Sequence, residues 1–286
     1  MVPGKGLALE SVDISALPHA QPHHYGRWLG ATLLVVALGY IVWAFAVGNI
    51  DWATVGDYIF HPRVMHGVAM TIVLSVISMV LGVLIGTATA IGRTSHNPVI
   101  SMTAAFYTWL FRGAPILLQL LIWYNLALIF PVIGIPGLWH APTVTVMTPF
   151  VAALIAFSLH EGAYTSEVIR SGLLSIDAGQ HEAAKSIGMG YGLTFRRIVL
   201  PQALRVVIPP LGNEFIGLLK MSALASVVGF LELTGTAQDI YYVNTKIMEM
   251  LFVATIWYLV IVSFFSMLQM WIERRVSRGF VNGGKH

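Results

Sequence analysis

Cysteine is absent from this 286-residue chain, and charged residues make up only 10% of it. The absence of cysteine excludes disulfide bonds and thiolate metal sites. The scarcity of charge, beside a hydrophobic content of 57%, excludes an ordinary soluble domain and indicates a membrane protein. A Gly-x-x-x-x-Gly-Lys-Ser/Thr phosphate loop is also absent, because the nearest approximation, from Gly86 to Thr94, has the wrong spacing and no lysine. We therefore expect no ATPase site in this chain.

Long runs that are mostly apolar predict six membrane-spanning helices. A helix needs about 20 mostly apolar residues to cross the hydrocarbon core of a bilayer. The runs that meet this requirement are residues 28–50, 64–92, 113–131, 147–169, 201–231 and 250–271. The expected fold class is therefore an all-α membrane protein. Residues 97–111 are interpreted as an interfacial elbow before the third span, and the prolines from Pro131 to Pro142 predict an uncharged loop after it.

The predicted organisation has four parts. We expect a cytoplasmic tail over residues 1–27, an N-terminal membrane helix over 28–50, a five-helix domain over 64–277 with a polar loop at 171–200, and a cytoplasmic tail over 278–286. The first span is also compatible with a cleaved signal peptide, because small residues at Ala44 and Ala46 follow an apolar run. The length of that run favours a retained helix.

Basic residues predict the orientation of the chain. If both termini lie inside, the outer loops contain only two basic residues, Arg63 and Lys246, and a third, Lys220, lies within the fifth span. The other 13 of the 16 basic residues fall on inner segments. The positive-inside rule then places loop 171–200 in the cytoplasm, where ATP is available. This distribution accounts for the net charge of +3 without a nucleic-acid partner.

The polar loop contains Glu182-Ala183-Ala184, then Gly188, then Leu200-Pro201 before the next apolar run. We expect a short surface helix with Glu182 in its first turn, where the helix dipole favours a negative charge, and with alanines that allow close approach of another protein. Gly188 is expected to end this helix in a left-handed conformation. The alternative is an amphipathic loop helix without a partner.

Several further segments occur in a fixed order: RGAPILLQ at 112–119, GAYTSEVIR at 162–170, GQHEAA at 179–184, LPQA at 200–203 and PPLGNE at 209–214. With these motifs, residues 66–276 resemble the permease subunits of type I ABC importers, and within them the polar amino acid group. The chain departs from that pattern after Lys220, where it reads Met221-Ser222-Ala223-Leu224 and lacks the usual Thr-Ser-Leu.

The resemblance implies a division of labour on the bacterial inner membrane. Two permease subunits, either copies of this chain or related chains, line the path. Two cytoplasmic ATPases bind ATP and Mg and dock on coupling helices, and a periplasmic or surface binding protein delivers the amino acid. The coupling residues of this chain would be Glu182, Ala183, Ala184 and Gly188, and the chain itself would bind no cofactor.

Depth along the helices selects candidate substrate contacts. At about 1.5 Å per residue, Glu161 lies roughly 20 Å from the outer end of its span and Asn213 roughly 18 Å from the inner end of its own, so both fall near the middle of the membrane. An amino acid needs acceptors for its ammonium and donors for its carboxylate. The candidate pathway residues are His160, Glu161, Tyr164, Gln119, Asn213, Glu214, Lys220 and Ser222.

Structural interpretations remain open for several polar residues. Glu167 and Arg170 have the spacing of a helix salt bridge. Arg112 is expected to anchor its helix at the inner interface. His160 is compatible with an interior histidine and Lys220 with a partner such as Glu214.

Other polar groups of the third and fifth spans also have two readings. Gln119 and Asn125 either face the path or bridge helices. Pro209-Pro210 and Gly212 are expected to interrupt the fifth span, either as an unwound stretch at the path or as a simple kink.

Two other functional classes are compatible with parts of the sequence. An ion-coupled secondary transporter would use Glu161, Glu214 and His160 as a proton relay and would show repeated halves, which the sequence lacks. A membrane assembly or channel subunit would need no substrate. The coupling motif argues against both, and predicts that closure of the ATPases pulls on the Glu182 helix and moves the inner ends of the fourth and fifth spans.

Overall fold

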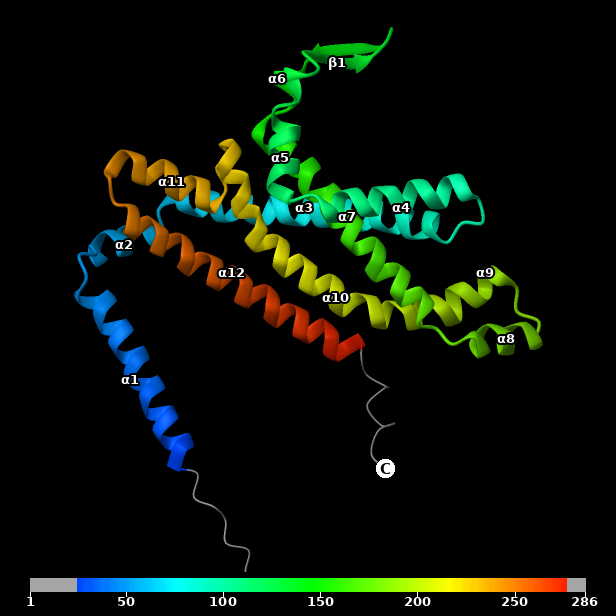
Figure 1. Cartoon of the computed structure of the whole chain (residues 1–286), viewed down its shortest axis with the longest axis horizontal. Helices are drawn as coiled ribbons and strands as arrows, with labels where there is room; N and C mark the ends of the chain where they lie inside the picture. The colour runs from blue at the N-terminus through cyan, green and yellow to red at the C-terminus, as the bar shows by residue number, and fades with distance from the viewer. Residues whose placement is uncertain (1–24, 277–286) are drawn as a thin grey trace, which may run out of the picture. The chain divides into compact units, whose positions relative to one another are not determined.

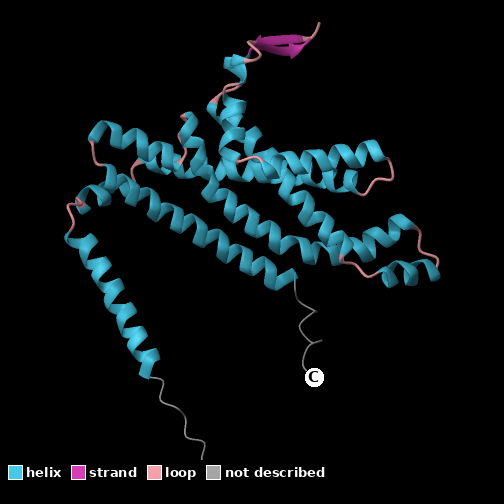
Figure 2. Cartoon of the chain, in the orientation of Figure 1, coloured by secondary structure: helices cyan, strands magenta, loops and turns pink. Residues whose placement is uncertain are grey.

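The computed structural model describes residues 25–276, and helices dominate that part of the chain (Figure 2). The chain divides into two units, residues 1–50 and residues 51–286. The first unit contains α1 (Tyr25–Val47), an apolar helix of 23 residues with no buried side chain. It begins at Tyr25, inside the segment predicted as a tail. The remainder of both predicted tails lies outside the described residues.

The second unit holds all the other elements (Figure 1). These are α2 (Trp52–Ile59), α3 (Pro62–Arg93), α4 (Pro98–Gly113), α5 (Ile116–Tyr124), a 3-10 turn (Leu126–Leu128), β1 (Val132–Ile135), β2 (Trp139–Pro142), α6 (Thr143–Val146), α7 (Pro149–Leu174), α8 (Ala178–Ser186), α9 (Tyr191–Thr194), a π turn (Phe195–Val199), α10 (Leu200–Met221), a 3-10 turn (Ser222–Val228), α11 (Leu233–Asn244) and α12 (Ile247–Val276). In Figure 1, α2 and α11 lie at one end of this unit, and α8 and α9 lie at the opposite end.

Local sequence signals set where three of the long helices start. A polar cap followed directly by proline begins α3, α4 and α7, with His61, Asn97 and Thr148 as the caps. Each cap side chain accepts a hydrogen bond from a backbone N–H of the first turn, such as Val99 N to Asn97 Oδ1 at 3.0 Å. Proline suits the next position because its missing N–H has no acceptor there in any helix.

Four described helices are long and apolar enough to cross a membrane, and the bent pair α4 and α5 would make a fifth. The four are α1, α3, the continuous stretch 191–228 and α12. Helix α7 has 26 residues, enough for roughly 39 Å. It is not among them, since its polar residues from His160 onward lower its mean hydropathy. The expected fold class of a helical membrane protein is confirmed, with one two-stranded hairpin besides the helices, while the count of six spans stays a prediction.

The third predicted span, residues 113–131, is not one helix. Helix α4 ends at Gly113 and α5 starts at Ile116 after a bend of 101°. Ala114 is extended, with ψ of 136°, because the following Pro115 disfavours helical backbone at this position. Helix α5 ends at Tyr124, and the predicted uncharged loop forms an antiparallel hairpin in which Ile135 pairs with Trp139.

The fifth predicted span also differs from expectation. The helix is continuous from Tyr191 to Val228, so it starts ten residues before Pro201 and runs through Pro209 and Pro210. The prediction that these prolines interrupt the helix was wrong, because proline removes a donor but keeps a φ that a helix accepts. Before Pro201 the helix widens into the π turn, in which Leu200 N–H donates to Phe195 O.

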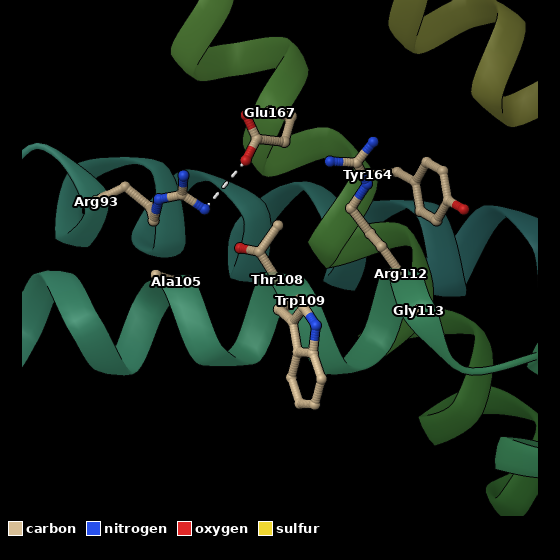
Figure 3. Close-up of a pocket in the computed structure, with 8 residues that line it drawn as sticks. All are labelled: Arg93, Ala105, Thr108, Trp109, Arg112, Gly113, Tyr164 and Glu167. Atoms are coloured by element: carbon tan, nitrogen blue, oxygen red, sulfur yellow. Dashed lines mark ion pairs between the residues drawn. The ribbon is translucent and has the colours of Figure 1, made fainter.

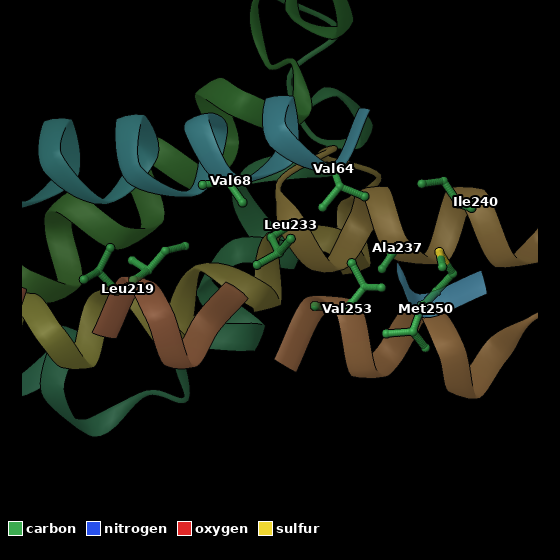
Figure 4. Packing of buried hydrophobic residues seen from close by; sticks show 11 residues of the cluster. Val64, Val68, Leu219, Leu233, Ala237, Ile240, Met250 and Val253 are labelled. Carbon is green, nitrogen blue, oxygen red and sulfur yellow. The ribbon is translucent and has the colours of Figure 1, made fainter. Parts of the chain in front are cut away.

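Helix α3 lies at the centre of the packing of the second unit. One apolar cluster joins it to α10, α11 and α12 through Val64, Leu219, Leu233 and Met250 (Figure 4). A second cluster joins it to α5, α7 and α10, with Phe157 among its fully buried members. This arrangement fixes α7 and α10, which carry most of the candidate pathway residues, against one common helix.

Ion pairs and hydrogen bonds fasten α2 to the start of α12 beyond the membrane-spanning part. Lys246 Nζ donates to Asp51 Oδ2 at 3.1 Å, and the Asp51 N–H donates to Glu249 Oε1 at 2.9 Å. Hydrogen bonds from Thr54, together with that from Lys246, lower the pKa of Asp51 to about 2. Arg63 forms a second ion pair, with Asp239 of α11.

Candidate coupling helix and transport pathway

The predicted surface helix of the polar loop is α8. Asp177 caps it by accepting the Gly179 N–H at 2.8 Å. Glu182 is the fifth residue of the helix, so the prediction that it lies in the first turn was wrong. The acidic group beside the helix N-terminus is Asp177, which accepts one of the free backbone donors there.

Gly188 ends α8 as the sequence predicted. Its φ is +78°, in the left-handed region that glycine adopts without steric cost. The Gly188 N–H donates to Lys185 O at 3.0 Å and the Met189 N–H donates to Ala184 O at 3.0 Å. This pair of bonds is the Schellman arrangement, which satisfies the last helical carbonyls and reverses the chain sharply.

The faces of α8 differ in exposure. Ala184 is 1% exposed, whereas Glu182, Ala183 and Lys185 are exposed. Ile187, just after the helix, is 76% exposed. Ala184 therefore packs α8 onto its own unit, and the opposite side offers a small residue, two charges and an apolar side chain to another protein.

On α7 the candidate pathway residues His160, Glu161 and Tyr164 lie together. The rings of His160 and Tyr164 are 4.7 Å apart, and Glu161 is 1% exposed. His160 Nδ1 and Glu161 Oε2 have no hydrogen-bond partner within the described part of the chain, nor has Oγ of the nearby Ser158. Buried polar atoms without partners are uncommon and costly, so their concentration on one turn calls for a functional reason.

Two glycines of α3 allow α7 to approach closely at this level. A Cβ at Gly82 would lie 2.7 Å from Glu161 Cβ, and a side chain at Gly86 would overlap Thr165. Thr165 Oγ1 donates to Gly82 O at 3.0 Å, which ties the two helices together. The two glycines therefore form a close-packing motif between α3 and α7, and the packing fixes the position of Glu161.

Helices α4 and α10 bring further charge to the cluster. Glu214 of α10 is half-buried and interacts electrostatically with Glu161 and with Arg112 of α4. The Arg112 guanidinium lies 5.1 Å from the centre of the Tyr164 ring. The sequence predicts that Arg112 anchors its helix at the inner interface, but its guanidinium contacts Tyr164, near the middle of α7. Along α4, Arg112 lies roughly 12 Å from Ala104, the residue that packs beside the end of α3.

The other candidate pathway residues have structural partners. Gln119 Nε2 donates to Phe111 O at 3.0 Å and to Ala114 O at 2.9 Å, so it fastens the bend between α4 and α5. Asn213 Oδ1 accepts a bond of 3.0 Å from Gln269 of α12. Ser222 is fully buried and donates to Leu219 O at 2.8 Å. These contacts favour helix bridging as the role of Gln119.

Lys220 and Asn125 lie apart from the cluster. Lys220 is exposed near the end of α10, and the ion pairs found among residues 25–276 do not include it. Asn125 is exposed and donates to Leu121 O of its own helix at 2.8 Å. The structure therefore brings together His160, Glu161, Tyr164 and Glu214, but not Lys220, Asn213 or Ser222, at one place.

The salt bridge between Glu167 and Arg170 is confirmed at 2.8 Å. Arg93, the last residue of α3, adds a second bond to Glu167, of 3.1 Å, which spacing along the sequence does not predict. These residues border a cavity of about 390 Å³ between α3, α4 and α7 (Figure 3). It is lined by Arg93, Ala105, Thr108, Trp109, Arg112, Gly113, Tyr164 and Glu167.

Glu232 is a buried polar residue that sequence reasoning missed. It is 0% exposed and caps α11, accepting the Thr234 and Gly235 N–H groups at 2.9 and 2.8 Å. Tyr258 of α12 and Thr71 of α3 donate to the same carboxylate at 2.7 and 3.3 Å. Its position just before a helical run is the cap signal that could have identified it.

Comparison with known proteins identifies the family. The family model described as binding-protein-dependent transport system inner membrane component matches residues 78–278. The arginine transport system permease protein ArgU of Corynebacterium glutamicum is 38% identical over 90% of this chain and 82% of its own length. The L-cystine transport system permease protein TcyB of Bacillus subtilis is 38% identical over 77% of this chain and 88% of its own length.

Solved structures agree with this assignment. A chain of an amino acid ABC transporter crystallised with histidines is 35% identical, with a TM-score of 0.69 over 79% of this chain and 99% of that one. A chain of the MetNI methionine ABC transporter shares the fold at 20% identity, with a TM-score of 0.58 over 75% of this chain and 96% of that one. The secondary-transporter and channel alternatives are therefore set aside. The chain belongs to the family of inner membrane components of binding-protein-dependent transport systems, the permease subunits of type I ABC importers.

Proposed function

We propose that this permease carries an amino acid, delivered by an external binding protein, across the bacterial inner membrane. The observation that carries the proposal is the identity of 38%, over 90% of this chain, to a permease named for arginine transport. The polar cluster on α7 supports it from the other direction. Its unpartnered buried atoms belong to a carboxylate and an imidazole, and such groups recognise ammonium and carboxylate.

In this proposal Glu161 and Glu214 accept the ammonium group of the substrate. They lie on facing helices and are close enough to interact electrostatically. A cation between them would relieve the repulsion of two carboxylates in a medium of low dielectric constant. The Tyr164 hydroxyl would supply a donor for the substrate carboxylate, and His160, whose other nitrogen already bonds the Phe111 backbone, would supply a second one from Nδ1 in its protonated form. The proposed substrate contacts do not include Asn213, Lys220 and Ser222. Asn213 is bonded to Gln269 of α12, Lys220 lies near the end of α10, and Ser222 follows that helix.

The energy source is proposed to be ATP hydrolysis in two partner ATPases, which bind ATP and Mg and dock on α8. The exposed side of α8, with Glu182 and Ala183, is the docking surface. Asp177 and Gly188 fix the two ends of α8, so a displacement of α8 is transmitted to α7 on one side and to the helix from Tyr191 on the other. Closure of the ATPases would thereby change the access of the Glu161 cluster.

The remaining parts of the assembly follow from the same reasoning. A second permease, a copy of this chain or a related one, would complete the path. Helix α8 lies at the opposite end of its unit from α2 and α11, as in Figure 1, so a cytoplasmic α8 puts Arg63 and Lys246 outside. Both termini are then cytoplasmic, in agreement with the positive-inside rule.

The test is substrate-stimulated ATP hydrolysis and uptake by the full assembly in lipid vesicles, with the binding protein loaded with arginine, histidine, glutamine or cystine in turn. Glu182→Gln should lower both activities, because it alters the docking surface. Asp57→Asn is the matched control, since it removes an exposed carboxylate from α2 at the other end of the unit. Glu161→Gln should abolish uptake while the ATPases still hydrolyse ATP at their basal rate.

Two results would contradict the proposal. Unchanged coupling in Glu182→Gln, with the same activities as Asp57→Asn, would remove α8 as the docking surface. Normal uptake of every amino acid by Glu161→Gln would remove the α7 cluster as the substrate site.

A further inference from the structure

The cavity between α3, α4 and α7 lies beside the proposed substrate contacts and shares Tyr164 with them. Its volume of about 390 Å³ is bordered by the end of α3 at Arg93 and by Arg112 of α4 (Figure 3). The carboxylates proposed to bind the ammonium group, Glu161 and Glu214, do not line it. Tyr164 forms the wall that the two places share.

The charges around this cavity favour an anion. Three positive guanidinium groups lie at or beside it, those of Arg93, Arg112 and Arg170. Two negative carboxylates, those of Glu167 and Glu214, lie near them, so the net charge of this set is +1. Glu167 is held by Arg93 at 3.1 Å and by Arg170 at 2.8 Å. Arg112 takes part in none of the ion pairs found within the described range, so its planar donor group remains available.

An apolar surface adjoins the arginines on α4. Met102, Phe106 and Trp109 follow the spacing i, i+4, i+7 and are 71%, 59% and 69% exposed. The rings of Phe106 and Trp109 are 5.7 Å apart, and in Figure 3 the indole of Trp109 extends away from Glu167. A ligand that fits both features has an anionic head for the arginines and a hydrocarbon part for this strip.

The Arg93 end of the cavity matches the phosphate layer of a bilayer, and Arg112 lies roughly 12 Å deeper along α4. Arg93 is the last residue of α3, a helix of 32 residues that is long enough to span the membrane. Phosphate groups lie at the ends of such spans, and basic pockets between membrane helices bind anionic lipid headgroups there. Arginine is suited to this role because its fork of N–H donors matches the oxygens of a phosphate.

We propose that this cavity binds the phosphate of an anionic phospholipid of the inner leaflet, with Arg112 and Arg93 as its ligands and an acyl chain along Met102, Phe106 and Trp109. The head fills the space beside Thr108 and Tyr164. The bound lipid would hold α4 against α3 and α7 at the level of the Glu167 ion pairs.

The experiment is native mass spectrometry of the intact transporter, with the full-length chain and its partner subunits, after delipidation. Phosphatidylglycerol, phosphatidylcholine with the same acyl chains, and inorganic phosphate are added separately. We expect retention of phosphatidylglycerol but not of phosphatidylcholine. Arg112→Gln should lower this retention by about tenfold or more, equivalent to about 1.4 kcal/mol, and it leaves the Arg93–Glu167 bond intact.

Arg205→Gln is the control, because it removes the same charge from an exposed position on α10 outside the cavity. Equal retention of both lipids, or equal losses in Arg112→Gln and Arg205→Gln, would overturn the proposal. If inorganic phosphate displaces phosphatidylglycerol and binds as tightly as the lipid does, the site binds a free anion, and the lipid assignment is overturned. A disulfide between Ala105→Cys and a cysteine introduced into the partner permease would show that protein covers the cavity, and it would overturn the lipid assignment as well. None of these readouts depends on transport.

Discussion

The contact between α3 and α7 at Gly86 yields the sharpest prediction of stability. A Cβ added at Gly86 would overlap Thr165 Oγ1 and would lie 3.0 Å from Gly162 O and from Ser166 N. Two of these three contacts are with backbone atoms of α7, which cannot rotate away. Gly86→Ala therefore forces the two helices apart at the level of the pathway cluster.

The cost can be separated from the intrinsic helix preference of alanine. Overpacking of this kind costs about 1–3 kcal/mol, whereas alanine gains up to about 1 kcal/mol over glycine inside a helix. Gly217→Ala in α10 has the same intrinsic gain, but nothing lies within 4 Å of its added Cβ. The difference between the two variants therefore isolates the packing term. At about 2–4 °C per kcal/mol, it amounts to roughly 2–12 °C in Tm.

The assay is thermal unfolding of the purified transporter, with substrate-stimulated ATP hydrolysis measured on the same samples. Gly86→Ala should melt below the wild type, and Gly217→Ala should melt at or above it. Adding Thr165→Ala to Gly86→Ala should recover part of the loss, because it removes the overlapping hydroxyl. Equal melting temperatures of Gly86→Ala and Gly217→Ala would refute the close packing of α3 against α7.

Three further predictions concern other parts of the chain. Gly188→Ala should reduce the stimulation of the ATPases by loaded binding protein, since alanine at φ +78° costs about 1 kcal/mol and disturbs the end of α8; unchanged stimulation would argue against a fixed α8. Gln119→Leu should destabilise the transporter by about 1–3 kcal/mol in thermal unfolding, because it removes two hydrogen bonds to partly buried carbonyls at the bend; a neutral effect would contradict this role. The lowered pKa of Asp51 contributes stability above its unfolded value of about 4, and this contribution is lost as the pH falls toward about 2. The Tm of Asp51→Asn should accordingly fall less than that of the wild type between pH 6 and pH 3, and an equal fall in both would count against the Lys246–Asp51 pair.

Much of the coupling region could be predicted because its determinants are local. A helix that ends in a Schellman arrangement needs a residue with positive φ, and Gly188 is the residue that can adopt it without strain. The alanine pair and the charges of the loop can also be read directly from the sequence. The glycines at positions 82 and 86 likewise reveal close helix packing. The exact start of α8 was missed because Asp177 competes with Glu182 for the N-terminal role, and only the backbone shows which one caps the helix.

The errors concern interactions between distant residues. The effect of Pro115 on Ala114 is local, but the 101° direction of the bend depends on Gln119 reaching back to two carbonyls. The continuity of α10 through Pro209 cannot be read from proline content alone, because packing decides whether a helix breaks or continues. Glu232 and Thr71 are separated by 161 residues, so no sequence spacing joins them.

ATP hydrolysis by the reconstituted assembly, measured with and without loaded binding protein and alongside uptake of the same amino acid, is the most direct test of coupling through α8. We expect loaded binding protein to stimulate hydrolysis and uptake together, Glu182→Gln to weaken both, and Glu161→Gln to stop uptake alone. Uptake driven by a proton gradient without any ATPase, at the same rate in the Glu182→Gln variant, would contradict coupling through α8.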